Sequence, residues 1–142
     1  MAEVKQRKRR RLNLEINNPD EKNMPQDAEE INKRIFKVFK HHIGKGNSIT
    51  AYDLFTKIFG VAPEHVDVFK REYLWRVLKQ ILTNLRSNEL LFVVNNNHDY
   101  YVLQSENELI MFKDKMDRVI DALHKTKNKA DSWVKNKKWR TL

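Results

Sequence analysis

The sequence predicts a mainly α-helical α+β domain with one small β-hairpin, and three observations support this fold class. Apolar residues recur at helical spacing in four stretches between residues 27 and 124. Between residues 90 and 103 the pattern changes to two short strand-like runs. Lysine and arginine are concentrated at the two ends of the chain. We therefore expect a disordered basic arm over residues 1–26, a folded domain over 27–104, a fourth helix over 105–124 and a basic tail over 125–142.

The first two predicted helices are recognised by their capping residues. Asp27 and Glu30 form an N-terminal capping pattern, and the helical periodicity that follows continues to Gly44. Thr50 is a favourable N-cap for the second helix, and Gly60 is expected to end it. The apolar residues of these two helices, which we expect in the core, are Ile31, Ile35, Val38, Phe39, Leu54, Phe55, Ile58 and Phe59.

The stretch from Val66 to Ser87 is the most regularly amphipathic part of the chain. Projection at 100° per residue separates an apolar face from a polar face. The apolar face holds Leu74, Val77, Leu78, Ile81, Leu82 and Leu85, and the polar face holds Glu72, Arg76, Lys79, Gln80, Thr83 and Arg86. A third helix with one buried and one solvated side is therefore expected.

A β-hairpin is predicted after the third helix. Leu90–Val94 and Tyr100–Leu103 have the residue pattern of two antiparallel strands, with Asn95–Asp99 as a five-residue tip. Asn88, near the end of the third helix, is of a residue type that tolerates a left-handed cap. A very short additional strand is expected at residues 48–49, directly before the second helix.

The fourth predicted helix begins at a second capping box, formed by Ser105 and Glu108. Its apolar residues follow alternating steps of three and four, a spacing that continues through Thr126, Ala130 and Trp133. This spacing is typical of a coiled-coil seam, although a helix that packs on the first helix of its own chain has a similar pattern. The two interpretations of this helix are therefore a homodimer through Leu109, Phe112, Met116, Val119 and Leu123, and packing on the first helix of the same chain.

The charge distribution indicates a polyanionic partner. The chain carries a formal net charge of +9, with six cations and one anion in residues 1–11 and seven cations and one anion in residues 125–142. The rest of the chain is slightly acidic, but residues 69–87 hold five cations against one anion. Charge of this kind attracts DNA, RNA or an anionic membrane surface.

The composition excludes several classes of protein. The absence of cysteine excludes disulfides, thiolate zinc sites and a cysteine nucleophile. The longest apolar run, Leu90–Val94, is too short to cross a membrane, and the basic start lacks the apolar stretch of a signal peptide. We expect a soluble intracellular protein of the cytoplasm or nucleoid, or of the nucleus in a eukaryotic host, with no membrane partner. The abundance of asparagine and lysine is typical of an AT-rich genome such as that of a virus or mobile element.

No pattern for catalysis is found in the sequence. His41 and His42 are adjacent and cannot share a helix face, and the other three histidines lack partners at metal-ligand spacing. Gly44 to Gly46 has no following Ser or Thr at P-loop spacing. We therefore expect no enzymatic activity, no metal and no cofactor.

The order helix, very short strand, helix, longer helix and hairpin, within residues 27–103, resembles the winged helix-turn-helix superfamily. The most similar stretch is LKQILTNLRSNELLFVV, in which the apolar positions of the third helix run into the first strand of the hairpin. The resemblance covers a little over half of the chain and rests on element order and apolar spacing, without a fingerprint motif. It assigns no single family.

The resemblance implies that the third helix enters the major groove of DNA. The candidate contacts on this helix are Lys70, Arg71, Arg76, Lys79, Gln80, Thr83 and Arg86. Arg76 and Gln80 are the candidates for base contacts, because Arg pairs bidentately with guanine and Gln with adenine. In the hairpin, or wing, Asn96, Asn97 and His98 are candidates for phosphate or sugar contacts, whereas many DNA-binding wings carry Arg or Lys there.

Both basic ends offer further contacts. The arm residues Arg7, Lys8, Arg9, Arg10 and Arg11 are typical of a nuclear localisation signal or of an arm that lies along phosphates. The tail residues Trp133, Lys135, Lys137, Lys138, Trp139 and Arg140 suit stacking on unpaired bases, insertion at a membrane interface, or docking on a partner. Packing of Trp133 against the fourth helix is the structural alternative.

Together these features predict a nucleic-acid-binding protein, with a double-stranded DNA-binding transcription regulator or architectural factor as the leading hypothesis. A second hypothesis is a winged-helix interaction module that binds a protein partner in a replication, transcription or virion assembly while its ends hold nucleic acid. A third is RNA or single-strand binding through the C-terminal tryptophans.

Overall fold

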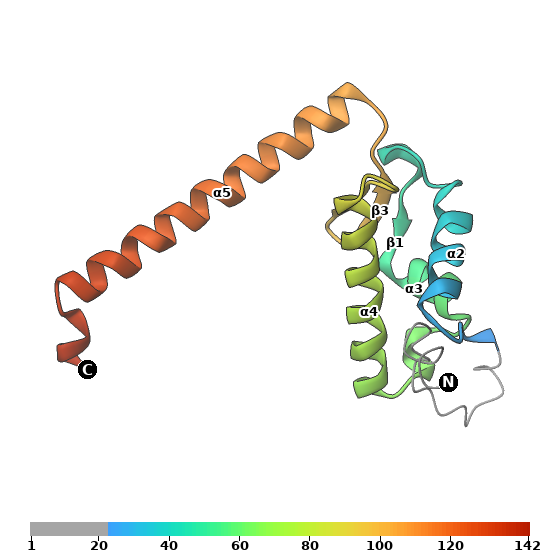
Figure 1. Cartoon of the computed structure of the whole chain (residues 1–142), viewed down its shortest axis with the longest axis horizontal. Coiled ribbons are helices and arrows are strands. Elements are labelled where there is room, and N and C mark those ends of the chain that lie inside the picture. Colours follow the sequence, from blue (N-terminus) through green and yellow to red (C-terminus); the bar gives the residue numbers. More distant parts are fainter. Residues whose placement is uncertain (1–22) are drawn as a thin grey trace, which may run out of the picture. The chain divides into compact units, whose positions relative to one another are not determined.

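The computed structural model describes residues 23–142, and the chain divides into two compact units at the Gln104–Ser105 boundary. The first unit contains α2 (Ala28–Phe39), β1 (Ile49–Thr50), α3 (Ala51–Phe59), α4 (Val68–Ser87), β2 (Val93–Asn96) and β3 (Asp99–Val102), with short 3₁₀ turns η2 (Lys45–Asn47) and η3 (Pro63–His65) (Figure 1). The second contains α5 (Glu106–Lys135) and the 3₁₀ turn η4 (Lys138–Thr141). This confirms the mainly α-helical α+β class.

The predicted caps of the first two helices are confirmed. The Asp27 carboxylate accepts a hydrogen bond from the amide of Glu30, and the Thr50 hydroxyl accepts one from the amide of Asp53. Gly60 ends α3 in the left-handed conformation, with φ of 73°. These side chains satisfy helix-end groups that have no partner within the helix.

Helix α2 ends at Phe39, earlier than the apolar periodicity predicts. The carbonyl of His42 accepts a hydrogen bond from the amide of Val102, and the amide of Gly44 donates to the carbonyl of Val102. The chain leaves the helix because these backbone groups pair with the end of β3 instead.

Three helices of the first unit enclose its apolar core. The side chains of Phe39, Phe55 and Phe59 are fully buried, as are those of Leu74 and Leu78 on α4. Burial of such a side chain contributes about 1.5–3 kcal/mol. The predicted apolar face of α4 is therefore the core face, with Leu82 and Leu85 also buried and Val77 and Ile81 partly buried.

The folded part begins before residue 27, so it includes the last residues of the predicted arm over residues 1–26. Met24 belongs to the hydrophobic core and Pro25 is fully buried. Burial of these two apolar side chains explains why the segment packs on the domain. The rest of the predicted arm, residues 1–22, lies outside the described residues.

The left-handed cap of α4 lies one residue after Asn88. Asn88 has φ of −92°, and the left-handed residue is Glu89, with φ of 56°. The amide of Leu90 donates to the carbonyl of Leu85, and the amide of Glu89 donates to that of Arg86. This pair of bonds is a Schellman motif, in which the left-handed residue lies one position after the C-cap.

The three strands form an antiparallel sheet in the order β1-β3-β2. Asn96 pairs with Asp99, so the hairpin turn consists of Asn97 and His98 only, with φ of 48° and 69°. The predicted five-residue tip is therefore wrong. Two residues of positive φ form a tight turn whose twist matches that of the strands, which lets Asn95 and Asn96 continue β2.

Helix α5 has the predicted cap, since the Ser105 hydroxyl accepts a hydrogen bond from the amide of Glu108. It continues to Lys135, beyond the predicted end at residue 124. No glycine or proline interrupts residues 125–135, so the helix has no stop signal there. No helix among residues 23–142 is long and apolar enough to cross a membrane.

Candidate nucleic-acid interface

A groove of about 650 Å³ runs between α4 and the hairpin in the first unit. Helix α4 lines it with Glu72, Trp75, Arg76 and Lys79, and the other lining residues are Ala51, Asn95, His98 and Tyr100. We call this the α4 groove. It brings together residues from three separate stretches of the sequence, including two of the predicted cations and one predicted wing residue.

The periodicity of α4 places Arg76 and Lys79 at the surface. Leu74 and Leu78 are buried on the opposite side of the helix, and positions 76 and 79 lie one turn apart on the exposed side. Arg76 forms no salt bridge with any residue from 23 to 142. The N–H groups of the Arg76 guanidinium are therefore available to donate hydrogen bonds to a ligand.

The Trp75 side chain joins α4 to the sheet beneath the groove. Its ring lies 5.5 Å from that of Phe55 and is stacked 6.5 Å from that of Tyr100, between ring centroids. The Lys79 ammonium lies 5.8 Å from the centroid of the Trp75 ring, a cation–π arrangement. Burial raises the pKa of Tyr100, so the phenol remains neutral at physiological pH and adds no negative charge to the groove.

The hairpin side of the groove is held in place by the backbone. The amide of Ala51 donates a hydrogen bond of 2.6 Å to the carbonyl of His98. Of the three predicted wing residues, only His98 lines the groove. Asn95, which was predicted in the tip without a role, lines it as well. Asn96 is part of β2, and Asn97 lies exposed in the turn.

The other predicted contacts on α4 are spread around the helix. Gln80 and Thr83 are exposed on the side of Arg76, and the Thr83 hydroxyl donates to the carbonyl of Lys79. Lys70 and Arg71 lie roughly 120° and 140° around the helix from Arg76, at 100° per residue. Lys70 and Arg71 therefore lie away from the side of α4 that Arg76, Gln80 and Thr83 share.

Two predicted arginines have contacts within the protein. The Arg71 guanidinium donates to the carbonyl of Pro63 at 3.4 Å. The Arg86 guanidinium carbon lies 5.8 Å from the centroid of the Phe92 ring, near the end of α4. Neither residue lines the α4 groove. The contacts of both arginines are with other parts of the first unit.

Sequence reasoning missed a second basic cavity, which we call the α2–α3 pocket. It has a volume of about 380 Å³ and is lined by Arg34, Lys37, Val38, His41 and Lys57. The Arg34 guanidinium donates to the carbonyl of Ile58 at 2.8 Å and pairs with Glu30. Lys37 lies on α2 and His41 in the turn directly after it, and only the packing of α3 brings Lys57 to them.

The predicted tail is divided between two elements of the second unit. Trp133 and Lys135 belong to α5, and the Lys135 ammonium pairs with Asp131 at 3.0 Å. Lys138, Trp139 and Arg140 lie in η4 after Lys137, and the Arg140 guanidinium lies 5.3 Å from the Trp139 ring. Both tryptophans are more than two-fifths exposed. The arm residues Arg7, Lys8, Arg9, Arg10 and Arg11 lie outside the described residues.

Within residues 23–142, no group of three or more His, Cys, Asp or Glu side chains is arranged to hold a metal ion. A scan against protein-family models, a search of curated proteins and a search of solved structures each found no match to this chain.

Proposed function

We propose that this protein is a non-enzymatic double-stranded DNA-binding protein, acting as a transcription regulator or architectural factor, and that α4 is its recognition helix. The α4 groove carries the proposal, because it brings Arg76 and Lys79 beside His98 and Asn95 of the hairpin. A helix with a two-stranded ribbon beside it is the arrangement of a winged helix, and the element order and the β1-β3-β2 sheet support this interpretation.

Each side chain has a distinct role in this proposal. Arg76 forms a bidentate pair with a guanine edge, and Gln80, one turn further along α4, pairs with adenine. Lys79 and His98 bind phosphates on either side of the groove and fix the orientation of the helix. The hairpin is short and has no Lys or Arg in its turn, so it makes phosphate contacts and does not read the minor groove.

A charge-matched pair of variants tests the assignment to α4. Arg76→Gln with Lys79→Gln removes two cations from the α4 groove, and Lys37→Gln with Lys57→Gln removes two from the α2–α3 pocket. With fluorescein-labelled duplex at constant salt, we expect the first pair to weaken binding by roughly tenfold or more and the second by about threefold or less. Equal losses would mean that net charge alone drives binding and would contradict the proposal.

Sequence preference needs its own measurement. Selection from random duplexes with the full chain is expected to enrich a motif, and Arg76→Gln is expected to relax that motif at one base pair. Quenching of tryptophan fluorescence by unstructured oligonucleotides, but not by duplex, would instead favour the third hypothesis, in which the C-terminal tryptophans bind single strands.

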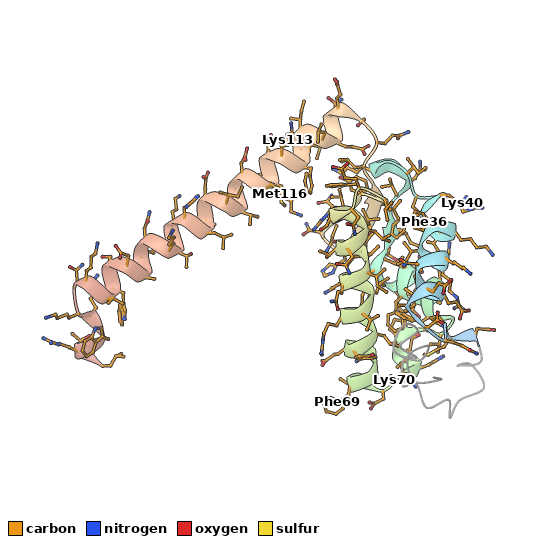
Figure 2. The ribbon with its side chains drawn as sticks, in the orientation of Figure 1. Phe36, Lys40, Phe69, Lys70, Lys113 and Met116 are labelled. Carbon is orange, nitrogen blue, oxygen red and sulfur yellow. The ribbon has the colours of Figure 1, made fainter. Side chains whose placement is uncertain are left out.

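One observation favours a second function, the docking of a protein partner on the first turns of α4. The side chain of Phe69 is 82% exposed, and Val68 and Tyr73 are also exposed (Figure 2 labels Phe69). An exposed aromatic patch of this kind is typical of interaction surfaces. A nuclease-resistant stoichiometric partner that is lost with Phe69→Ser, while DNA affinity is retained, would support this function.

A further inference from the structure

Helix α5 carries an apolar stripe that includes several exposed side chains. The helix has 30 residues and none of them is buried. Leu109, Val119 and Leu123 are 37%, 45% and 64% exposed. Most of the stability of a helix in water comes from packing of its apolar face, so a stripe of this length indicates a partner.

The stripe follows a heptad repeat over four heptads. The a positions are Leu109, Met116, Leu123 and Ala130, and the d positions are Phe112, Val119, Thr126 and Trp133. Met116 lies in this stripe and Lys113 beside it (Figure 2). Repetition every seven residues keeps the a and d side chains on one seam between two supercoiled helices.

We propose that two copies of this chain associate through α5 as a parallel, in-register coiled coil. Charges beside the seam favour this orientation. In a parallel pair, Glu108 at position g of one copy faces Lys113 at position e of the other, and symmetry gives this attraction twice. The remaining g and e positions in register pair Lys115 with Ile120, Ala122 with Lys127 and Lys129 with Val134, so no like charges meet.

The antiparallel arrangement of the same four heptads is less favourable. It places Lys113 against Lys127 at the e positions and Lys115 against Lys129 at the g positions, each pair occurring twice by symmetry. Like charges placed opposite one another are destabilising and select against such a pairing. Charge complementarity therefore favours a second copy of α5 as the partner of the stripe, in the parallel orientation.

The parallel orientation has a consequence that rests on the proposed function. Helix α5 follows the first unit directly at residue 105, so both first units join the coiled coil at the same end. Two α4 helices are then available to two half-sites of one duplex. The dimer itself does not depend on DNA binding. Measurements of association without DNA therefore test the dimer separately from the proposed function.

The first test measures mass with the full-length chain in analytical ultracentrifugation at micromolar concentration. We expect twice the chain mass of 17.1 kDa. Leu123→Glu places a carboxylate in the seam and is expected to weaken association by roughly a hundredfold or more. The matched variant His124→Glu, at the outward b position, is expected to remain dimeric. A single-chain or three-chain mass for the natural sequence would overturn the proposal.

The second test determines direction and uses the absence of cysteine from the chain. Ala130→Cys lies at an a position, so a parallel pair brings its two thiols within disulfide reach under mild oxidation. Asp121→Cys, at the outer f position, is the control and is expected to stay reduced. An antiparallel pair puts residue 130 opposite residue 112. Cross-linking only in the double variant Phe112→Cys with Ala130→Cys would therefore overturn the parallel assignment.

Discussion

The amide of Ala51 donates a 2.6 Å hydrogen bond to the carbonyl of His98, and this bond joins the first turn of α3 to the hairpin turn. The pairing continues at the next position, where Thr50 lies opposite Asp99. The position of His98 in the α4 groove is therefore set by α3 as well as by the strands. This bond therefore helps to hold the hairpin turn beside Arg76 in the α4 groove.

Ala51→Pro is expected to break this link without breaking α3. Proline is well tolerated at the first position of a helix, but its ring removes the amide hydrogen and places a Cδ atom against the carbonyl of His98. We expect a loss of at least about 0.5–1.5 kcal/mol in urea unfolding, with unchanged helical circular dichroism. Hydrogen exchange of the amides in the hairpin is expected to accelerate. Ala51→Ser keeps the amide and is the control, and equal stability of the two variants would show that the bond contributes nothing.

Gly60→Ala is expected to destabilise the first unit more than Gly46→Ala. Gly60 has φ of 73°, and a Cβ atom there would lie 2.7 Å from the Cβ of Asn23 and 2.9 Å from its carbonyl oxygen. A left-handed backbone costs a residue with a side chain roughly 1–2 kcal/mol before this contact is counted. At Gly46 nothing lies within 4 Å of the added atom. Thermal unfolding of both variants measures the difference, and similar melting temperatures would contradict the contact with Asn23.

Local signals in the sequence predicted the helices of the first unit well. Thr50 and Gly60 act within one or two turns of their own helix, so residue type alone indicates where α3 begins and ends. The hairpin turn was predicted less well. Asn97 and His98 both adopt positive φ, and a run of polar residues does not show which two of them will do so. Strand register, which depends on pairing with distant residues, decides the turn.

In the candidate site, too, local features could be predicted from the sequence and features that depend on distant residues could not. Arg76 and Lys79 were predicted because helical periodicity places them opposite the buried leucines. Lys70 was grouped with them because charge was counted along the segment, whereas helical geometry places Lys70 roughly 120° around α4 from Arg76. Lys57 was missed altogether. It reaches the α2–α3 pocket only through the packing of α3 against α2, and one sequence contains no direct signal for helix packing.

Tyr52→Phe is expected to lower stability only within a defined range of pH. The Tyr52 hydroxyl donates a 2.6 Å hydrogen bond to the Glu64 carboxylate. This bond lowers the pKa of Glu64 below its ordinary value of 4.5 and raises the pKa of Tyr52 above 10.0. The lowered pKa of Glu64 stabilises the folded state above pH 4.5, and this stabilisation is lost as the pH falls through the pKa of Glu64 in the folded state. The raised pKa of Tyr52 stabilises the folded state below pH 10.0, and this stabilisation is lost as the pH rises through the pKa of Tyr52 in the folded state.

The measurement is the difference in melting temperature between the natural chain and Tyr52→Phe. We expect it to be constant between pH 4.5 and 10.0 and to shrink outside that range on both sides. Tyr73→Phe removes the hydroxyl of an exposed tyrosine on α4 and is the control. A Tyr52→Phe difference that persists in acid would show that the hydroxyl acts through another group.

Neutralising the N-terminal arginines separates the two interpretations of the basic arm. The triple variant Arg9→Gln, Arg10→Gln and Arg11→Gln removes three cations from the full chain. If these side chains lie along phosphates, the slope of log affinity against log salt is expected to fall by up to about 2.7, since each neutralised phosphate contributes about 0.9. Duplex titrations across a range of sodium chloride concentrations measure this slope.

The control for the arm removes equal charge elsewhere, with Lys33→Gln and Lys37→Gln on α2 and Lys40→Gln at its C-cap. This control is expected to change the slope much less. The base preference selected by Arg76 is expected to survive in the arm variant, because phosphate contacts position a protein without reading sequence. An unchanged slope in the arm variant would leave the localisation signal as the role of these arginines. The affinity of the protein for DNA would then have to come from α4 and the C-terminal cations.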